Sequence, residues 1–313
     1  MPEFIGMGEI LIDFISMKTG VKVRDSPGFY KYAGGAPANT TVGVSRLGHS
    51  SGFITKLGDD EFGKYLLSVL EENKVDTSHV IWSREARTAL AFVSIDEKGE
   101  RSFEFYRHPA ADQLIRPDEI SGEYIKSAKI LHLGSVGMAV EPSRSAHIHA
   151  MKVAKENGVL VSFDPNIREN LWPDPSVMRS VILSAIPLCD IFLPSEDEMA
   201  FLFDDLETGA KKVLDMGVSI VVIKMGAKGA VAYTKEQKIF QKPFKVEVVS
   251  TVGAGDAFNA GFLHGYLSGK EISKSLLYGA GCAARVITMK GAMSALPRAD
   301  ELEDFIREHS SLV

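Results

Sequence analysis

The sequence predicts an α/β fold built on a mainly parallel sheet that helices cover on both faces. Four short apolar runs have the length of buried strands, and each is followed by a segment that suits a helix or a turn. Fully apolar strands that alternate with helices are typical of parallel sheets, because both faces of such a sheet are covered. The four runs are Ile130–Leu133, Val159–Phe163, Ile191–Leu193 and Ile220–Ile223.

Two stretches break this rhythm and predict a small β lid inserted into the main fold. Leu90–Ile95 and Ser102–Arg107 flank the turn-like segment Asp96–Gly99, which is typical of an antiparallel hairpin. Residues from about Phe14 to Ala33 also look extended and lack helical periodicity. Since no repeat or linker divides the chain, we expect a single domain over residues 1–313, with a lid formed by about 14–33 and 88–110. Two unrelated surface excursions remain the alternative.

The composition is that of a soluble globular protein, with 45% hydrophobic and 24% charged residues. The net charge is −6, from 35 basic and 41 acidic residues. We therefore expect neither nucleic acid nor a membrane as a partner, and local groups must bind any anionic ligand. Cys189 and Cys282 lie far apart without metal-ligand spacing, and the first residues lack a signal-peptide pattern. These features predict a cytoplasmic protein without disulfides.

The strongest local motif is Thr251-Val252-Gly253-Ala254-Gly255-Asp256, directly before a predicted helix at Ala257–Leu267. A glycine-rich turn that opens a helix presents free backbone N–H groups at the positive end of the helix dipole, which is a ready anion site. Asp256 has two interpretations that the spacing leaves open: an N-terminal cap, or a base beside the anion site. In either case the helix terminus predicts an ionised, weakly basic carboxylate.

Three further segments place polar residues or glycines where ligands could bind. Gly34–Asn39 leads into a helix, with Pro37 in its first turn and Gly48 as a stop; an ordinary start of a helix is the alternative. Asp164–Arg168 follows a predicted strand, where α/β sheets bind ligands but where turns also favour Asp and Asn. Lys224–Gly229 suits a strand-connecting turn and a nucleotide-edge loop equally well.

Three apparent motifs are set aside. Gly58–Tyr65 has the spacing of a phosphate-binding Walker A loop, but it ends in Tyr where Mg²⁺ binding needs Ser or Thr, so we interpret it as a capped helix start. Gly6-Met7-Gly8 lacks the third glycine of a dinucleotide site, which disfavours a nicotinamide-dependent oxidoreductase. His147 and His149 are two residues apart on a predicted helix and cannot share a metal.

Taken together and in this order along the chain, the motifs resemble the signature regions of the ribokinase-like (PfkB) carbohydrate kinases. The resemblance spans the chain: Gly8-Glu9 with Asp13, Gly34–Asn39, the hairpin, Asp164–Asn166, Gly253–Asp256 and Lys290–Ala292. Within the family, three regions look most like fructokinases: Gly34–Asn39, Phe103–Arg107 with Ala111-Asp112, and Arg168 with Leu171-Trp172. The implied fold is a three-layer α/β/α ribokinase-like domain with a mainly parallel central sheet and a small β-sheet lid.

The resemblance also implies a role for each matching residue. Asp256 would be the catalytic base, and Gly253, Ala254 and Gly255 the anion hole. Sugar hydroxyls would bind Asp13, Gly34, Gly35, Asn39, Arg107 and Asn166, together with Asp256. ATP would bind Ser195, Lys224, Gly226 and Gly229, together with Gly253 and Gly255. Glu198 would contact Mg²⁺ indirectly, through a metal-bound water.

Three departures from the family pattern leave parts of this expectation open. Ser195 stands where relatives usually have Asn in the Asn-x-x-Glu segment near the Mg–ATP phosphates. Ser250 stands where Asp is common beside a monovalent cation, so a K⁺ requirement is open. Ala280 lies near the position of an Asn close to adenine, which leaves the nucleotide preference open. Lids of relatives sometimes pair between subunits, so a homodimer through the lid is also open.

The resemblance implies an ATP- and Mg²⁺-dependent sugar kinase, with D-fructose as the expected substrate and fructose 6-phosphate as the product. The alternatives of the same fold are 2-keto-3-deoxygluconate kinase, ribokinase and aminoimidazole riboside kinase. A non-catalytic sugar sensor is the alternative of another class. Retention of Asp256 beside Gly253–Gly255 argues against a sensor, because a protein that only binds sugar needs neither.

Overall fold

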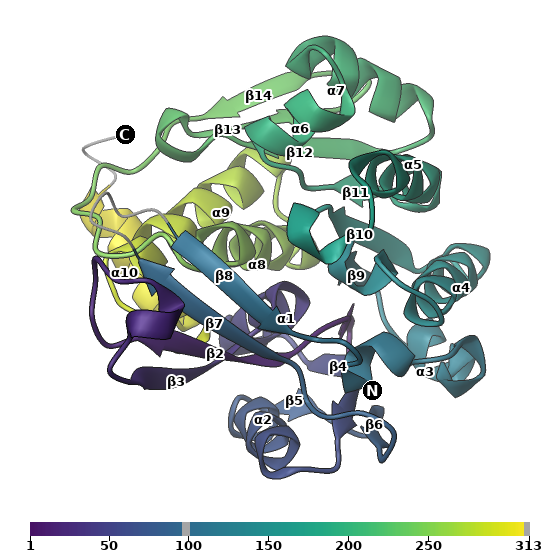
Figure 1. Cartoon of the computed structure of the whole chain (residues 1–313). Coiled ribbons are helices and arrows are strands. Elements are labelled where there is room, and N and C mark those ends of the chain that lie inside the picture. The colour runs from purple at the N-terminus through teal and green to yellow at the C-terminus, as the bar shows by residue number, and fades with distance from the viewer. Residues whose placement is uncertain (96–100, 310–313) are drawn as a thin grey trace.

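The computed structural model describes residues 1–95 and 101–309, and within them a large central sheet has helices on both faces (Figure 1). Its strand order is β14-β13-β12-β11-β10-β9-β1-β4-β5, and β6 pairs with β4. The strands are β1 (Phe4–Met7), β4 (Ser51–Gly58), β5 (Val75–Asp76), β6 (Val80–Ser83), β9 (Ile130–Gly134), β10 (Leu160–Asp164), β11 (Ile191–Phe192), β12 (Ile220–Lys224), β13 (Ala230–Tyr233) and β14 (Lys238–Gln241). The antiparallel pairs of the described central sheet are β12 with β13 and β13 with β14, at one edge.

Two hydrophobic cores lie on opposite faces of this sheet, as apolar strands in a covered sheet require. One core contains residues of α3 (Gly122–Lys126), α4 (Ser143–Glu156), α5 (Pro175–Ala185), α6 (Glu196–Leu202) and α7 (Leu206–Asp215). The other contains residues of α1 (Ala36–Arg46), α2 (Glu61–Glu72), α8 (Ala254–Leu267), α9 (Ile272–Ile287) and α10 (Ala299–His309). The predicted three-layer α/β/α class is therefore confirmed, and the four apolar runs form β9 to β12.

A second, four-stranded sheet has the order β3-β2-β7-β8 and lies beside the α1 and α2 end of the central sheet (Figure 1). Its strands are β2 (Leu11–Ser16), β3 (Phe29–Gly34), β7 (Leu90–Ile95) and β8 (Arg101–Tyr106). The predicted hairpin is present, since β7 and β8 pair antiparallel, while the turn Asp96–Gly99 lies outside the described residues. Both predicted lid segments contribute strands to one sheet, and the first begins at Leu11, three residues before the expected Phe14.

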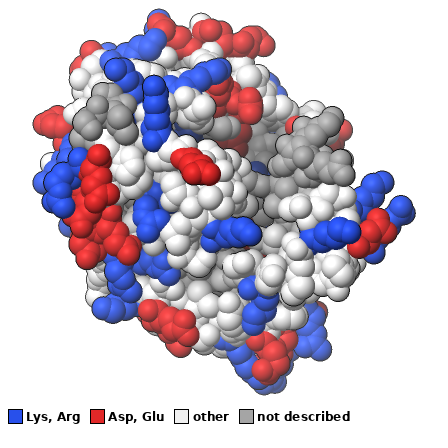
Figure 2. Space-filling model, turned by 90° about the vertical axis from the view of Figure 1, so that its left-hand side faces the viewer, with Lys and Arg blue, Asp and Glu red and all other residues white. Residues whose placement is uncertain are grey.

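The surface and the helices agree with a globular protein of mixed charge. Figure 2 shows acidic and basic side chains interspersed on one face, without a broad patch of either sign. None of the helices in the described parts of the chain is long and apolar enough to cross a lipid bilayer.

Candidate active site

The first turn of α8 carries the glycine-rich motif. Gly253 is the N-cap and has φ 75°, in the left-handed region that favours glycine, and a Cβ atom there would lie 2.6 Å from Ala292 Cβ. The helix starts at Ala254, three residues before the predicted start, so the interpretation of Asp256 as the cap is wrong. The first i→i−4 bond runs from Ala257 N–H to Gly253 O, at 2.9 Å. The N–H groups of Gly255 and Asp256 therefore precede the helical ladder and face outward as donors.

Asp256 contacts the other glycine-rich segment, which opens α1. Asn39 Nδ2 donates to Asp256 Oδ2 at 2.7 Å, although the residues lie 217 positions apart in the sequence. Thr40 Oγ1 donates to the Asp256 carbonyl oxygen at 3.4 Å. As predicted, Pro37 lies in the first turn of α1 and Gly48 follows its end with φ 101°. The structure thus brings two of the predicted site residues into direct contact.

The pKa of Asp256 differs from the sequence expectation. Burial, with a smaller contribution from the nearby charge of Asp164, raises the pKa of its carboxyl to about 6. The hydrogen bond from Asn39 and the charges of Lys224 and Arg168 oppose this rise. The expectation of a weakly basic carboxylate is therefore wrong, because burial outweighs the helix terminus. Asp256 is still ionised at neutral pH, and it is basic enough to accept a proton.

A second carboxylate, Asp13 on β2, is electrostatically coupled to Asp256. Burial and, to a smaller extent, the charge of Asp256 raise the pKa of Asp13 to about 7, against an opposing effect of the charge of Arg168. A Cβ atom on Gly34 would clash with Asp13 Oδ2, so glycine at this position leaves room for the carboxylate. Gly35 is the N-cap of α1 with φ 109°, and a Cβ atom there would clash with the backbone of Glu9.

The carboxyl end of β10 supplies the next group of side chains. Asp164 ends the strand, and its Oδ1 accepts the N–H of Asn166 at 3.1 Å in a turn where Asn166 has φ 39°. Arg168 follows, and its charge lowers the pKa of both Asp13 and Asp256. The sequence predicts the polar segment Asp164–Arg168 as a possible ligand site, but within it only Asn166 is given a role by the family resemblance.

Lys224, at the end of β12, lies among these groups. Its Nζ donates to Asp164 Oδ2 at 2.8 Å and to Asn259 Oδ1 at 3.2 Å. Asn259 on α8 is fully buried and was not predicted from the sequence, because an isolated polar residue inside a helix carries no motif. The predicted nucleotide residue Lys224 is thus part of a buried polar cluster next to the first turn of α8.

Ser195 and Glu198 form the start of α6. Ser195 Oγ accepts the N–H of Glu198 at 3.2 Å, and Glu198 Oε2 accepts the N–H of Ser195 at 2.7 Å. Glu198 Oε1 accepts the N–H of Ile167 at 2.7 Å, which joins α6 to the loop after β10. In the described residues no group of three or more His, Cys, Asp or Glu is arranged to hold a metal ion. The arrangement fits an indirect contact of Glu198 with Mg²⁺, which usually keeps several waters and is bound mainly through phosphates.

Gly226 and Gly229 lie in the connection between β12 and β13, with φ 53° and φ 101°. A Cβ atom on Gly229 would clash with the carbonyl oxygen of Gln241, whereas one on Gly226 would meet nothing within 4 Å. The interpretation as a strand-connecting turn is therefore confirmed, and contact of either glycine with ATP stays a prediction.

Arg107 is the predicted sugar residue that the structure buries most deeply. It directly follows β8, is 1% exposed and pairs with Asp112, while its charge also lowers the pKa of the buried Glu9. Glu9 Oε1 accepts the N–H of Ala36 at 3.3 Å, so the charge of Arg107 acts on a carboxylate that is bonded to the start of α1. Its Nε and Nη1 have no partner within the described residues, and its contact with sugar stays a prediction.

Two rejected motifs have the structural roles expected of them. Asp60 caps α2, since its Oδ1 accepts the N–H groups of Phe62 and Gly63 at 3.1 and 2.9 Å. His147 is buried, and its Nδ1 lies 2.8 Å from the carbonyl oxygen of Ser143. Neither segment takes part in the cluster around Asp256.

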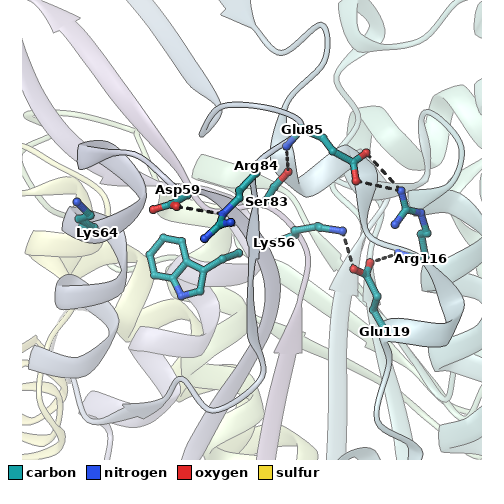
Figure 3. A pocket seen from close by; sticks show the side chains of 9 residues that line it. Lys56, Asp59, Lys64, Ser83, Arg84, Glu85, Arg116 and Glu119 are labelled. Atoms are coloured by element: carbon teal, nitrogen blue, oxygen red, sulfur yellow. Dashed lines mark hydrogen bonds and ion pairs between the residues drawn. The ribbon is translucent and has the colours of Figure 1, made fainter.

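A surface pocket of about 700 Å³ lies elsewhere, along the ends of β4 and β6 (Figure 3). No predicted site residue lines it. Lys56 in this pocket pairs with Glu119 at 2.6 Å, Arg116 with Glu85 at 3.4 Å and Arg84 with Asp59 at 3.7 Å. Because these charges compensate one another, we do not assign the active site to this pocket.

Comparisons with known proteins agree with the resemblance found in the sequence. The profile of the pfkB family carbohydrate kinases matches residues 1–299. Fructokinase-1 from Zea mays is 40% identical over 314 residues, which cover 97% of each chain. The crystal structure of a fructokinase with bound ATP from Xylella fastidiosa has a TM-score of 0.92 and 31% identity, and the match covers 99% of this chain and 100% of that one.

A double mutant of fructokinase from Vibrio cholerae O395, solved in a form with fructose, ADP and potassium ion, has a TM-score of 0.87 and 34% identity. The match covers 97% of this chain and 98% of that one. The family profile, the identity over nearly the whole length and the shared fold point to the same conclusion. The chain belongs to the pfkB family of carbohydrate kinases.

Proposed function

We propose that this carbohydrate kinase transfers the γ-phosphoryl group of Mg–ATP to D-fructose and forms fructose 6-phosphate. The observation that carries the proposal is the position of Asp256: a carboxylate with a pKa of about 6, in the first turn of a glycine-opened helix, bonded to Asn39 and coupled to Asp13. This arrangement combines a proton acceptor, an anion site and hydroxyl-binding groups. The fructokinase relatives support fructose as the acceptor.

The sugar would be bound both by hydrogen-bond acceptors and by hydrogen-bond donors. Asn39 Oδ1 is buried without a partner in the described structure, and the carboxylate of Asp13 lies next to Gly34. Buried polar atoms without partners make a site selective, because an analogue that lacks the matching hydroxyl leaves them unpaired. Asn166 and Arg107 remain predicted members of this site. Arg168 joins them as an exposed cation whose charge lowers the pKa of both carboxylates.

In the transfer step, Asp256 would orient the attacking hydroxyl and accept its proton. The bond between the γ-phosphorus and the ADP oxygen breaks while the bond to the sugar oxygen forms. Such transition states are loose, so the hydroxyl loses its proton late and its orientation matters most. The N–H groups of Gly255 and Asp256, at the positive end of α8, would stabilise the charge on the moving phosphoryl oxygens. Mg²⁺, bound with the nucleotide, neutralises phosphate charge, and Glu198 would contact one of its waters.

The small sheet would act as a lid over the sugar. Asp13 lies on β2 of this sheet, so a movement of the sheet would carry a sugar-binding carboxylate with it. Closure would exclude water, which competes with the sugar as phosphoryl acceptor. A homodimer through this sheet and a cytoplasmic location stay predictions. A K⁺ requirement also stays a prediction, which the potassium-bound relative supports. It should be measured because Ser250 stands where relatives commonly have Asp.

The test is the turnover of the wild-type protein with Mg–ATP on a panel of fructose, ribose, 2-keto-3-deoxygluconate and aminoimidazole riboside. We expect the highest kcat/KM with fructose, with ADP and fructose 6-phosphate formed in equal amounts. A higher kcat/KM with another member of the panel would replace fructose as the substrate. Binding of sugar without any release of ADP would contradict the kinase function and favour a sensor.

A further inference from the structure

Three side chains from different elements form a closed hydrogen-bonded triangle beside the first turn of α8. Lys224 Nζ donates to Asp164 Oδ2 at 2.8 Å and to Asn259 Oδ1 at 3.2 Å. Asn259 Nδ2 donates to the same Asp164 oxygen at 2.5 Å. The triangle joins the ends of β10 and β12 to α8, at a position three residues after Asp256 and on the same face of the helix.

The triangle holds the Lys224 ammonium against the proposed phosphate site. A Cβ atom built on Gly255 would lie 3.7 Å from Lys224 Nζ. The N–H group of Gly255 precedes the first i→i−4 bond of α8, which is donated by Ala257. The ammonium and the positive end of the helix dipole therefore present their charge to the same small region.

The geometry leaves the ammonium able to bind a ligand. An ammonium has three N–H donors, and within the described residues the triangle uses two of those of Lys224. Asn259 is fully buried, and the side chains of Asp164 and Lys224 are 6% and 12% exposed. The two acceptors are thus fixed in the interior while the charged group reaches the edge of the site.

We propose that Asp164 and Asn259 are positioning residues of the phosphoryl transfer, which hold the Lys224 ammonium where its charge stabilises the phosphoryl group as it passes to the sugar. The inference rests on the kinase function proposed above and adds two side chains to it. A lysine loses much rotamer entropy when it is fixed, and two rigid acceptors meet that cost before the substrates bind. Charge that is already in place in a partly desolvated site stabilises a transition state without reorganisation. Lys224 keeps its protons throughout, and the hydroxyl proton passes to Asp256.

The charge balance around Asp256 supplies a readout that a purely structural role would not change. The groups that face its carboxylate are Asp13 from β2, Asn39 from α1, Asp164 from β10, Arg168 from the following loop and Lys224 from β12. The charge of Asp164 raises the pKa of Asp256, and the charge of Lys224 lowers it. Asp164→Asn should therefore shift the titration of Asp256 to lower pH, and Lys224→Met should shift it to higher pH.

The first experiment follows this titration in the unliganded protein by NMR of ¹³C-labelled Asp carboxyls, with Asp256→Asn used for assignment. We expect shifts in opposite directions for the two variants. Shifts in the same direction, or none, would overturn the proposal, since general disruption of the site cannot produce opposite signs. This readout needs neither ATP nor turnover.

The second experiment measures turnover of Lys224→Met, Asn259→Leu and the double variant with Mg–ATP and the sugar that the wild type prefers. We expect each single variant to lose about 10- to 100-fold in kcat, with less than about a threefold change in sugar KM. The double variant should lose no more than Lys224→Met alone, because Asn259 acts through that ammonium. Additive losses, or normal kcat in the folded variants, would overturn the proposal.

Matched variants separate a loss of function from a loss of folding. Asn73→Leu removes a similar contact far from the site, where Arg46 Nε donates to Asn73 Oδ1 at 2.7 Å, and we expect normal kcat. If Asn259→Leu fails to fold, Asn259→Ala, which removes the acceptor without adding a branched side chain, serves for the same comparison. A wild-type protein that phosphorylates no sugar would contradict the proposed function instead, and the titration would still test the triangle.

Discussion

The first turn of α8 and the pocket along β4 and β6 both gather charged side chains, but they treat the charges differently. In the pocket, Lys56, Arg84 and Arg116 each pair with a carboxylate of the same pocket (Figure 3). Next to α8, burial and the charge of Asp256 raise the pKa of Asp13 to about 7, and burial raises the pKa of Asp256 itself. The cations of the pocket are thus paired with carboxylates, whereas two carboxylates with raised pKa values lie next to α8.

This difference indicates that buried charged side chains without a compensating partner are a better guide to the functional site than the volume of a pocket. A pocket in which each cation is already paired with a carboxylate gains little binding free energy from a charged ligand, because the ligand must first displace that carboxylate. A pair of carboxylates with raised pKa values costs stability, and such a cost is typical of sites that bind or transfer protons. The following variants test the contrast between the two regions.

Apart from Asp256→Asn, for which we expect the greatest loss of turnover, the largest expected effect separates the two glycines of the α8 turn. Gly255→Ala should fold normally, because its Cβ atom would meet only Lys224 Nζ at an ordinary 3.7 Å, yet the methyl group would occupy the proposed phosphate site. We expect a loss of about 10- to 100-fold in kcat with an unchanged melting temperature. Gly253→Ala should instead lower the melting temperature, because it combines φ 75° with a contact of 2.6 Å to Ala292.

Steady-state kinetics and thermal unfolding of both variants check this pair. The assignment of the anion site to this turn is contradicted if Gly255→Ala turns over like the wild type.

A smaller effect is expected at Arg107. Arg107→Ala removes the cation that pairs with the buried Asp112 and whose charge acts on the buried Glu9, which is bonded to the start of α1. We expect the KM for sugar to rise by about tenfold and the KM for ATP to change much less, because the disturbance reaches the sugar-binding segment first. Circular dichroism controls for folding, and equal changes in both KM values would remove Arg107 from the sugar side of the site.

A further effect concerns stability and pH. The folded pKa of Asp256, about 6, lies above its ordinary value of 3.8, so the folded state binds the proton more tightly than the unfolded state. The carboxylate therefore destabilises the fold above pH 6, and this cost fades as the pH falls toward 4. Asp256→Asn should raise the melting temperature by about 2–4 °C at pH 8 and much less at pH 4. An equal change at both pH values would show that burial does not raise this pKa.

The smallest effect is expected in the pocket of Figure 3. Arg84→Ala and Arg116→Ala each remove one exposed ion pair, at 3.7 and 3.4 Å. We expect kcat/KM to stay within about twofold of the wild type and the melting temperature to change by about 1 °C or less. A large loss of turnover in either variant would show that the pocket takes part in the reaction and would remove the contrast drawn above.

Much of the fold could be predicted from local patterns, because a buried strand can be recognised from the apolar residues that form it. Ile130–Leu133 and Ile220–Ile223 are apolar runs of strand length, and both are central strands. The start of α8 was placed three residues late, since Ala254 and Gly255 read as loop until Gly253 is seen to take the left-handed conformation that caps the helix.

The site was harder to predict because its properties depend on contacts between distant segments. The motifs contain Asn39 and Asp256, but neither motif shows that the two side chains meet. The residues are 217 positions apart in the sequence, and the fold places Asn39 Nδ2 2.7 Å from Asp256 Oδ2. The raised pKa of Asp256 is a consequence of burial, which no local pattern records. Asn259 has no motif at all, and only its bonds to Asp164 and Lys224 distinguish it from another polar residue in a helix.

The most direct test of the account compares wild type and Asp256→Asn by the rate of fructose 6-phosphate formation from fructose and Mg–ATP, with sugar and nucleotide affinities measured by calorimetry. We predict that the variant binds both ligands with affinities close to those of the wild type and loses about 10³-fold or more in kcat. Turnover of the variant at the wild-type rate would contradict the role of Asp256 and with it the proposed mechanism.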